Sequence, residues 1–258
     1  MPYSLESISK ASRRSPESVL GKLARLPLRL VPHHFVVPIL TGKLRGKRWI
    51  AGSAIHRCWL GFYEYDKQKM ISRELRRNAV FYDIGANVGF YSLLASQFVD
   101  GGKVFAFEPL PQNLAYLEKH IALNHVQNVE ILALAVSNTN GRSFFAVERT
   151  RSMGCLASDG GIGIEVATAT LDSLVEQGRI LPPNCIKMDV EGAEFLALQG
   201  ARETFRRYRP VLFLATHGQE VYRQCRYLLE SWGYAWRDLG FIGDFGEVVA
   251  EFRDSTTS

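Results

Sequence analysis

From residue 79 onward, short apolar runs typical of buried strands alternate with longer segments whose apolar residues recur at helical spacing. The strand-like runs are VFYDI (80–84), KVFAFE (103–108), VEILALAVS (129–137), CIKMDV (185–190) and PVLFLAT (210–216). Each is rich in β-branched and aromatic residues, which suit the interior of a sheet. Alternation of this kind favours right-handed β-α-β crossovers. We therefore predict an α/β protein with a doubly wound, mostly parallel sheet.

The alternation is interrupted once and then resumes. After Ser137, residues 138–170 contain two alternating strands around a loop rich in Gly and Ser, which predicts a β-hairpin insertion. Helices are expected over 193–208 and 219–232, followed by a final strand pair near 234–239 and 247–252. We expect residues 1–78 to form a basic N-terminal extension with a lid-like segment, and residues 79–258 to form the main domain.

The net charge of +5 is concentrated at the N-terminus, because residues 1–50 hold ten Lys or Arg and only two Glu. No aromatic stacking array or recognition-helix motif accompanies these charges, so we do not expect a nucleic-acid partner. The leucines of residues 17–31 permit contact with a membrane surface, but packing on the domain is the commoner outcome. With no apolar leader or membrane-spanning run, we expect a cytoplasmic protein.

The four cysteines are too far apart to form a zinc knuckle or a disulfide framework. They stand at Cys58, Cys155, Cys185 and Cys225, and no C-x-x-C pair occurs. Buried reduced thiols are the expected state.

The stretch DIGANVG, residues 83–89, turns the chain from a strand into a helix. Such a turn points backbone N–H groups outward, and its glycines let a ligand approach the backbone closely. Dinucleotide sites use G-x-G-x-x-G for a pyrophosphate, whereas this turn reads D-x-G-x-N-x-G. An acid beside donors and carbonyls suits a ligand with both an ammonium and a carboxylate group, such as the methionine end of S-adenosylmethionine. A purely local turn role for Asp83 is the alternative.

Glu108 ends the second strand, 19 residues after Gly89. An acid at this place in a β-α-β nucleotide site accepts hydrogen bonds from the ribose hydroxyls. The alternative is that Glu108 only caps the helix that follows it. In a doubly wound sheet the ligand lies beyond the carboxyl ends of the strands, where Ser137 and Asp189 are also expected, so we count both as candidate cofactor contacts.

Several blocks of the chain together resemble the FkbM family of S-adenosylmethionine-dependent methyltransferases. They are FYDIGANVGFYSLLAS, GKVFAFEPLPQNLAYLEKHIALN, NVEILALAVSN, IKMDVEGAEFLALQGA and PVLFLATHG. The resemblance implies a class I methyltransferase Rossmann-like fold with seven strands, and chiefly O-methylation of sugars or other small molecules. It also implies S-adenosylmethionine as the cofactor. Carried over by position, the resemblance implies that the methionine end is lined by Asp83, Gly85, Asn87 and Gly89. It also implies that Glu108 contacts the ribose.

The same resemblance places Asp189 and Glu191 at the methyl-transfer mouth. Many relatives have an acid at the end of the strand PVLFLAT, where this chain has Ala215 and Thr216 before His217. A hydroxyl acceptor needs a base, and His217 is suited by type and position, as are Asp189 and Glu191. A structural role for His217 is the alternative. The carboxylates of DVEGAE could also hold Mg²⁺, but we expect no metal, because an acid at Glu194 also stabilises a helix N-terminus.

The acceptor is expected to be a small-molecule hydroxyl, such as one on a saccharide. Candidate contacts are Tyr63 and Glu64 in the lid-like segment and Arg151 and Ser152 in the insertion. N-methylation of an amide or amine remains an alternative, and a binding-only Rossmann module is another. A nicotinamide oxidoreductase is disfavoured because the G-x-G-x-x-G turn is absent. Nothing in these residues indicates the oligomeric state.

Overall fold

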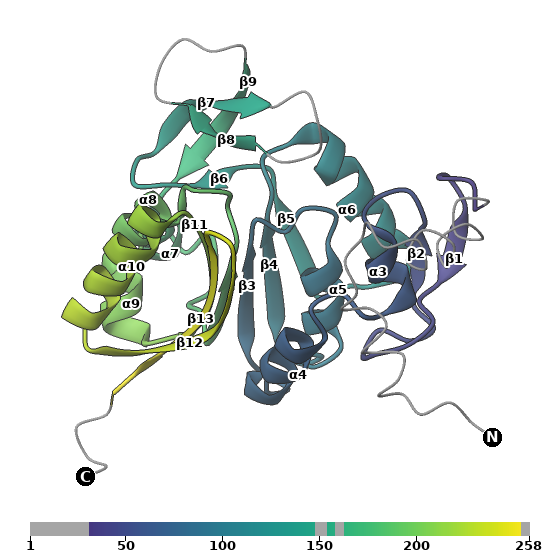
Figure 1. Cartoon of the computed structure of the whole chain (residues 1–258), viewed down its shortest axis with the longest axis horizontal. Coiled ribbons are helices and arrows are strands. Elements are labelled where there is room, and N and C mark those ends of the chain that lie inside the picture. Colours follow the sequence, from purple (N-terminus) through teal and green to yellow (C-terminus); the bar gives the residue numbers. More distant parts are fainter. Residues whose placement is uncertain (1–30, 148–153, 158–162, 254–258) are drawn as a thin grey trace.

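The protein, described here from a computed structural model covering residues 31–147, 154–157 and 163–253, is built around a seven-stranded sheet (Figure 1). Its strands are β3 (Val80–Ile84), β4 (Lys103–Phe107), β5 (Val129–Leu132), β10 (Cys185–Met188), β11 (Val211–His217), β12 (Tyr234–Ile242) and β13 (Phe245–Phe252). They lie in the order β12-β13-β11-β10-β3-β4-β5, and every pair is parallel except those made by β13. The predicted doubly wound, seven-stranded sheet is confirmed.

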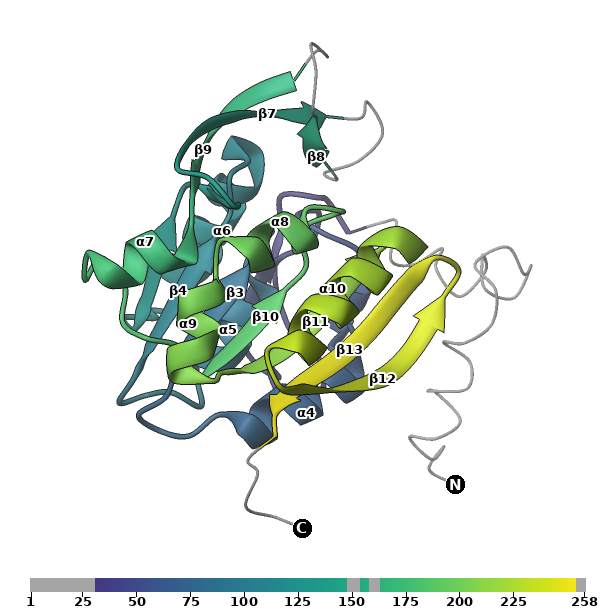
Figure 2. The same ribbon diagram turned by 90° about the vertical axis from the view of Figure 1, so that its left-hand side faces the viewer.

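Helices cover both faces of this sheet (Figures 1 and 2). One face carries α4 (Tyr65–Glu74), α5 (Phe90–Ser96) and α6 (Pro111–Leu123), and the other carries α7 (Leu171–Glu176), α8 (Glu194–Gln199), α9 (Arg202–Tyr208) and α10 (Gln219–Ser231). The pleat of β3 explains why both faces are apolar. Phe81 packs in the cluster that includes Leu93, whereas Tyr82 and Ile84 point the other way into the cluster that includes Phe205.

The predicted single helix over 193–208 is wrong, because the chain forms α8 and α9 with a break at Gly200. The carbonyl of Gly200 accepts a hydrogen bond from Asp172 N, and a Cβ at Gly200 would lie 2.0 Å from the carbonyl oxygen of Ser137. The Asp172 carboxylate accepts the backbone N–H groups of Glu203 and Thr204 at 3.0 and 2.7 Å. The apolar residues keep their helical spacing through this region, but the cap supplied by Asp172 of α7 begins a new helix there.

The insertion is larger than the predicted hairpin. It forms a four-stranded sheet in the order β6-β9-β7-β8, which projects from one end of the molecule (Figures 1 and 2). Its strands are β6 (Ala135–Val136), β7 (Gly141–Val147), β8 (Gly154–Ala157) and β9 (Gly163–Ala169). The predicted strand 129–137 is correspondingly divided, because a turn in which Leu134 N donates to Leu132 O sends β6 into this second sheet.

The described part of the N-terminal extension packs on the α5 side of the main sheet. It contains the antiparallel pair β1 (Val36–Pro38) and β2 (Arg48–Ile50), then α3 (His56–Leu60) and α4. Trp49 is fully buried in the same apolar cluster as Phe90 of α5. The amphipathic stretch 17–31 lies almost wholly outside the described residues. Within the described ranges, no helix is both long enough and apolar enough to cross a bilayer.

Three cysteines, Cys58, Cys185 and Cys225, are buried and form no disulfide. Burial raises the pKa of each thiol, to about 12 for Cys58. These three agree with the expected reduced thiols, while the side chain of Cys155 lies outside the described set.

Candidate active site

A cavity of about 700 Å³ opens at the carboxyl ends of β3, β4 and β10. The neighbouring strands β3 and β10 are where the sheet reverses its winding, since β4 and β5 continue on one side and β11 on the other. This is the switch point at which doubly wound proteins bind ligands. The cavity wall also includes residues of the N-terminal extension, among them Ser53, Ile55 and Tyr63. The extension therefore completes the site.

The glycine turn forms one wall of this cavity through Gly85 and Asn87. Gly85 has a φ of +74°, and a Cβ there would lie 1.9 Å from the carbonyl oxygen of Asp189, so only glycine fits. Asn87 also has a positive φ, of 50°, which places its backbone N–H toward Glu108. Gly89 is not among the lining residues. It is the residue before α5, and a Cβ on it would lie 2.4 Å from Leu117 Cδ1, so its role is packing.

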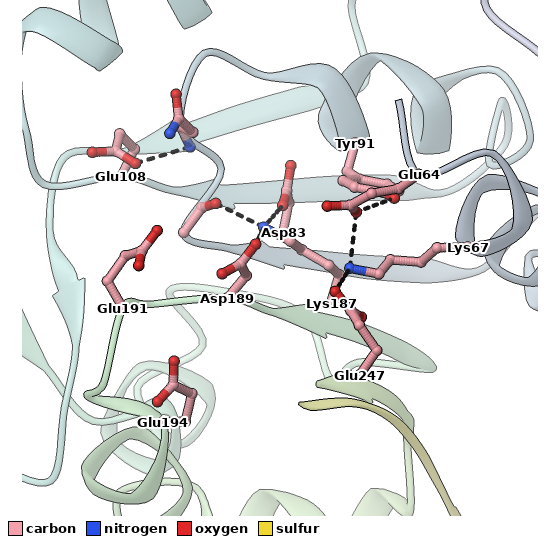
Figure 3. A network of polar contacts seen from close by, with 12 residues as sticks. Glu64, Lys67, Asp83, Tyr91, Glu108, Lys187, Asp189, Glu191, Glu194 and Glu247 are labelled. Carbon is pink, nitrogen blue, oxygen red and sulfur yellow. Dashed lines mark hydrogen bonds and ion pairs between the residues drawn. The ribbon is translucent and has the colours of Figure 1, made fainter. Parts of the chain in front are cut away.

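Asp83 does not line the cavity either, although the sequence predicted that it would. Its carboxylate is fully buried, accepts a hydrogen bond from Ser92 Oγ at 2.7 Å and lies 3.4 Å from Lys187 Nζ. Lys187 in turn donates to the carbonyl of Gly85 at 2.8 Å (Figure 3). Asp83 thus supports the glycine turn through Lys187. The only signal of Lys187 in the sequence is a charged residue inside the apolar run CIKMDV.

Glu108 lines the cavity, and its carboxylate also accepts a hydrogen bond from Leu110 N, just before α6 begins, while its contact with a ribose stays a prediction. Its carboxylate accepts a hydrogen bond from Asn87 N at 2.9 Å (Figure 3), and others from Leu110 N at 3.0 Å and Asn113 Nδ2 at 3.2 Å. Burial raises the pKa of Glu108, and these hydrogen bonds partly oppose that rise. The acid at the end of β4 is therefore held rigidly against the glycine turn.

Asp189, Glu191 and His217 come together at the other side of the cavity. His217 Nε2 lies 3.1 Å from Glu191 Oε2 and 3.6 Å from Asp189 Oδ1, while His217 Nδ1 donates to Glu194 Oε1 at 2.6 Å. Asp189 and Glu191 line the cavity, and Figure 3 shows their carboxyl groups pointing into the same space. His217 stands behind them rather than in the wall.

The charges in this cluster act on one another. Burial favours a lower pKa for His217, but the hydrogen bond to Glu194 and the charges of Asp189 and Glu191 raise it overall. Burial raises the pKa of Glu191, whereas Lys187, Lys67 and His217 together outweigh burial and lower the pKa of Asp189. A histidine with a raised pKa carries a proton more readily, which makes it a weaker candidate for a base acting alone.

A buried ion-pair network, which the sequence did not predict, joins the N-terminal extension to the sheet. Lys67 Nζ on α4 lies 2.8 Å from Glu64 and 2.6 Å from Glu247 on β13, and Tyr91 on α5 donates to Glu64 at 2.7 Å (Figure 3). Burial disfavours the charged form of Lys67, but its acidic neighbours raise its pKa. Glu64 therefore holds the extension in place, which positions the neighbouring Tyr63 in the cavity wall.

Ser137, another candidate residue, is not brought to the cavity. Ser137 is 4% exposed, is not among the lining residues, and its Oγ lies 3.5 Å from Asn138. The strand that was expected to present it ends earlier, at Leu132. Arg151 and Ser152 lie outside the described residues.

Comparison with known proteins places the chain among methyltransferases. Over 139 residues it is 30% identical to the hexuronic acid methyltransferase AglP of Haloferax volcanii, covering 53% of this chain and 56% of that protein. The chain thus spans little more than half the length of this curated relative.

Solved structures show the same fold at low identity. The methyltransferase FkbM of Methylobacillus flagellatus KT superimposes with a TM-score of 0.51 at 18% identity, over 69% of this chain and 44% of that one. An rRNA methylase of Streptococcus thermophilus gives a TM-score of 0.50 at 10% identity, over 74% of this chain and 96% of that one. The model of the methyltransferase FkbM domain matches residues 83–254, from the glycine turn to the last strand. Since that match spans more than half of the sequence, the chain belongs to the FkbM methyltransferase family.

Proposed function

We propose that the protein transfers the methyl group of S-adenosylmethionine to a hydroxyl group of a saccharide or another small molecule. The observation that carries this proposal is the position of Glu108. Its carboxylate stands in the cavity wall at the end of β4 and faces the backbone of the glycine turn. An acid in this position is suited to accept hydrogen bonds from two ribose hydroxyls. Membership of the FkbM methyltransferase family supplies the reaction class.

The cofactor contacts follow from which residues line the cavity. We assign the methionine end to the backbone around Gly85 and Asn87 and to Asp189, and the ribose to Glu108. Asp83 takes an indirect part, because its ion pair with Lys187 supports the Gly85 carbonyl. Gly89 and Ser137 have no place among these contacts.

Methyl transfer is an in-line displacement at the sulfonium methyl. The acceptor oxygen forms a bond to the methyl carbon, the carbon–sulfur bond breaks, and its electron pair remains on sulfur in S-adenosylhomocysteine. A rigid cavity contributes by holding oxygen, carbon and sulfur in line. The hydroxyl proton must also leave, and we assign its acceptance to the Asp189–Glu191–His217 cluster as a unit. His217 reaches the cavity through Glu191, 3.1 Å away, and Asp189, 3.6 Å away.

A saccharide acceptor is supported by the relative named for hexuronic acid. The cavity volume lies within the roughly 300–1,000 Å³ that small-molecule sites occupy, and Tyr63 offers an aromatic wall. Tyr63 is thus the described residue best placed to contact the acceptor.

Calorimetric titration of S-adenosylmethionine and S-adenosylhomocysteine tests the cofactor assignment. We expect Glu108→Gln and Glu108→Ala to weaken binding by about 1–3 kcal/mol, the cost of leaving hydrogen-bonding groups unpaired. Glu118→Gln, an exposed acid on the adjoining α6, serves as the matched control and should bind normally. Absence of binding to the folded wild type, or equal binding by Glu108→Ala, would refute the assignment. Release of S-adenosylhomocysteine with hydroxyl and amine acceptors then separates O- from N-methylation.

A further inference from the structure

Two strand ends bring three metal-binding side chains into one place. Asp189 and Glu191 follow β10, and His217 ends β11. One ligand atom from each residue can be chosen so that all three lie within 4.8 Å of one another. Two of these separations are short, since His217 Nε2 lies 3.1 Å from Glu191 and 3.6 Å from Asp189.

These separations match the ligand spacing around a small cation. Ligands bound at about 2.1 Å in an octahedron lie about 3.0 Å apart when adjacent and about 4.2 Å apart when opposite. The mixture of two carboxylates and an imidazole suits first-row transition ions better than Ca²⁺ or Mg²⁺, which prefer oxygen alone. We propose that Asp189, Glu191 and His217 bind a divalent transition-metal cation of the Mn²⁺ type at the mouth of the cavity.

A second observation at the same place concerns Glu194. This residue is fully buried, and its Oε1 accepts hydrogen bonds from His217 Nδ1 and from Gly192 N. With Nδ1 engaged in this way, Nε2 is the ring nitrogen left to face Asp189 and Glu191. A carboxylate behind a histidine is the usual support of a metal-binding imidazole. The other oxygen of Glu194, Oε2, is buried without a hydrogen-bond partner among the described residues, and in Figure 3 the carboxyl group lies on the Glu191 side.

The surrounding charge also favours a cation. Two neighbouring groups of ion pairs contain six carboxyl groups against two lysines and one histidine; the acids are Glu64, Asp83, Asp189, Glu191, Glu194 and Glu247. Lys67 is engaged with Glu64 and Glu247, and Lys187 pairs with Asp83 and Asp189. Among the ion pairs of the described residues, Glu191 and Glu194 pair with His217. Glu194 is fully buried, and a buried carboxylate is costly, so a divalent cation close by would help to balance its charge.

A cation at this mouth would serve the acceptor rather than the cofactor turn. Its ligands Asp189 and Glu191 line the cavity, so its open coordination positions would be reachable from there. An acceptor oxygen bound to a cation is held in place and becomes a better nucleophile as its pKa falls. Without a cation, a sugar that carries a carboxylate would meet the carboxylates of Asp189 and Glu191 at this wall.

Electron paramagnetic resonance with Mn²⁺ as the probe tests the site directly. Free Mn²⁺ gives a six-line spectrum that diminishes when the ion binds, so titration of the metal-free full chain yields stoichiometry and affinity. We expect one ion per chain. Glu191→Gln and His217→Asn should weaken binding at least about tenfold, and Glu194→Gln about 10–100-fold through the lost support of His217. Glu220→Gln, an exposed acid on α10, is the matched control and should bind as the wild type does.

Each outcome decides the proposal. Failure of the wild type to bind Mn²⁺ at millimolar concentration, or equal binding by His217→Asn and the wild type, would overturn it. Should a variant fail to fold, as judged by circular dichroism, the wild type still provides a test, because a specific site requires Mn²⁺ to raise its melting temperature in a saturable way. The measurement contains no methyl donor, so its result is independent of whether methyl transfer is detected.

Discussion

Acidification should destabilise the protein through one buried histidine, His120 on α6. Its Nδ1 donates to the carbonyl of Val88 in the glycine turn at 2.7 Å, and its Nε2 accepts from Ile50 N of β2 at 3.1 Å. The ring also stacks on Trp49, with centroids 3.8 Å apart. Since the neutral imidazole uses both nitrogens, a second proton would bind Nε2 and place its N–H against the N–H of Ile50. His120 therefore links the N-terminal extension to the turn only while it is uncharged.

Burial lowers the pKa of His120 from 6.5 to about 4, against the opposing effect of the Val88 hydrogen bond. When folding lowers the pKa of a histidine, its contribution to stability is full above the pKa that it has in the unfolded chain. That contribution is lost as the pH falls toward the pKa that it has in the folded protein. The unfolded chain binds the proton first, from pH 6.5 downward. The resulting loss is about 1.3 kcal/mol between pH 7.5 and 5.5, and about 2.5 kcal/mol by pH 4.5.

Urea unfolding of the wild type and His120→Gln at several pH values measures this contribution. The variant should be less stable at pH 7.5, because glutamine cannot reproduce both bonds and the stack. The difference in unfolding free energy between the two proteins should shrink by about 1.3 kcal/mol at pH 5.5, since only the wild type loses the histidine contribution. His125→Asn, which removes an exposed histidine after α6, controls for general titration. A wild-type to His120→Gln difference that stays constant with pH would refute the reasoning.

Three further predictions concern the cavity. Gly85→Ala should abolish S-adenosylmethionine binding in calorimetry and lower the melting temperature. Gly192 also has a positive φ, but nothing lies within 4 Å of a Cβ placed on it, so Gly192→Ala should lower the binding affinity and the melting temperature less. Lys187→Met should destabilise by about 3–5 kcal/mol in urea unfolding because Asp83 is left buried and unpaired, and adding Asp83→Asn should recover part of that loss; no recovery would argue against the pair. Tyr63→Ala should raise the acceptor KM while the cofactor Kd is unchanged, and a selective loss of cofactor affinity would place Tyr63 elsewhere in the site.

The local patterns of the sequence were sufficient for the fold class. A strand or a helix can be recognised from the spacing of apolar residues in about ten positions, so the alternation of the two predicted the doubly wound sheet. The turn at Gly85, together with Glu108, predicted where the cavity lies. The break at Gly200 was not predictable in this way. It depends on a cap from Asp172, 31 and 32 residues before the two N–H groups that it accepts, and no local pattern carries that information.

The sequence by itself determined which strand ends carry polar residues, whereas only the tertiary structure decided which of them meet the ligand cavity. Asp83 and Glu108 looked alike as acids at strand ends, yet one is buried against Lys187 and the other lines the cavity. Lys67 pairs with Glu247 across 180 positions, and His217 at the end of β11 contacts Glu194 of α8. The physical reason is that the free energy of a buried charge depends on the groups around it. The arrangement of the strands and helices in space, rather than their order in the chain, determines which groups those are.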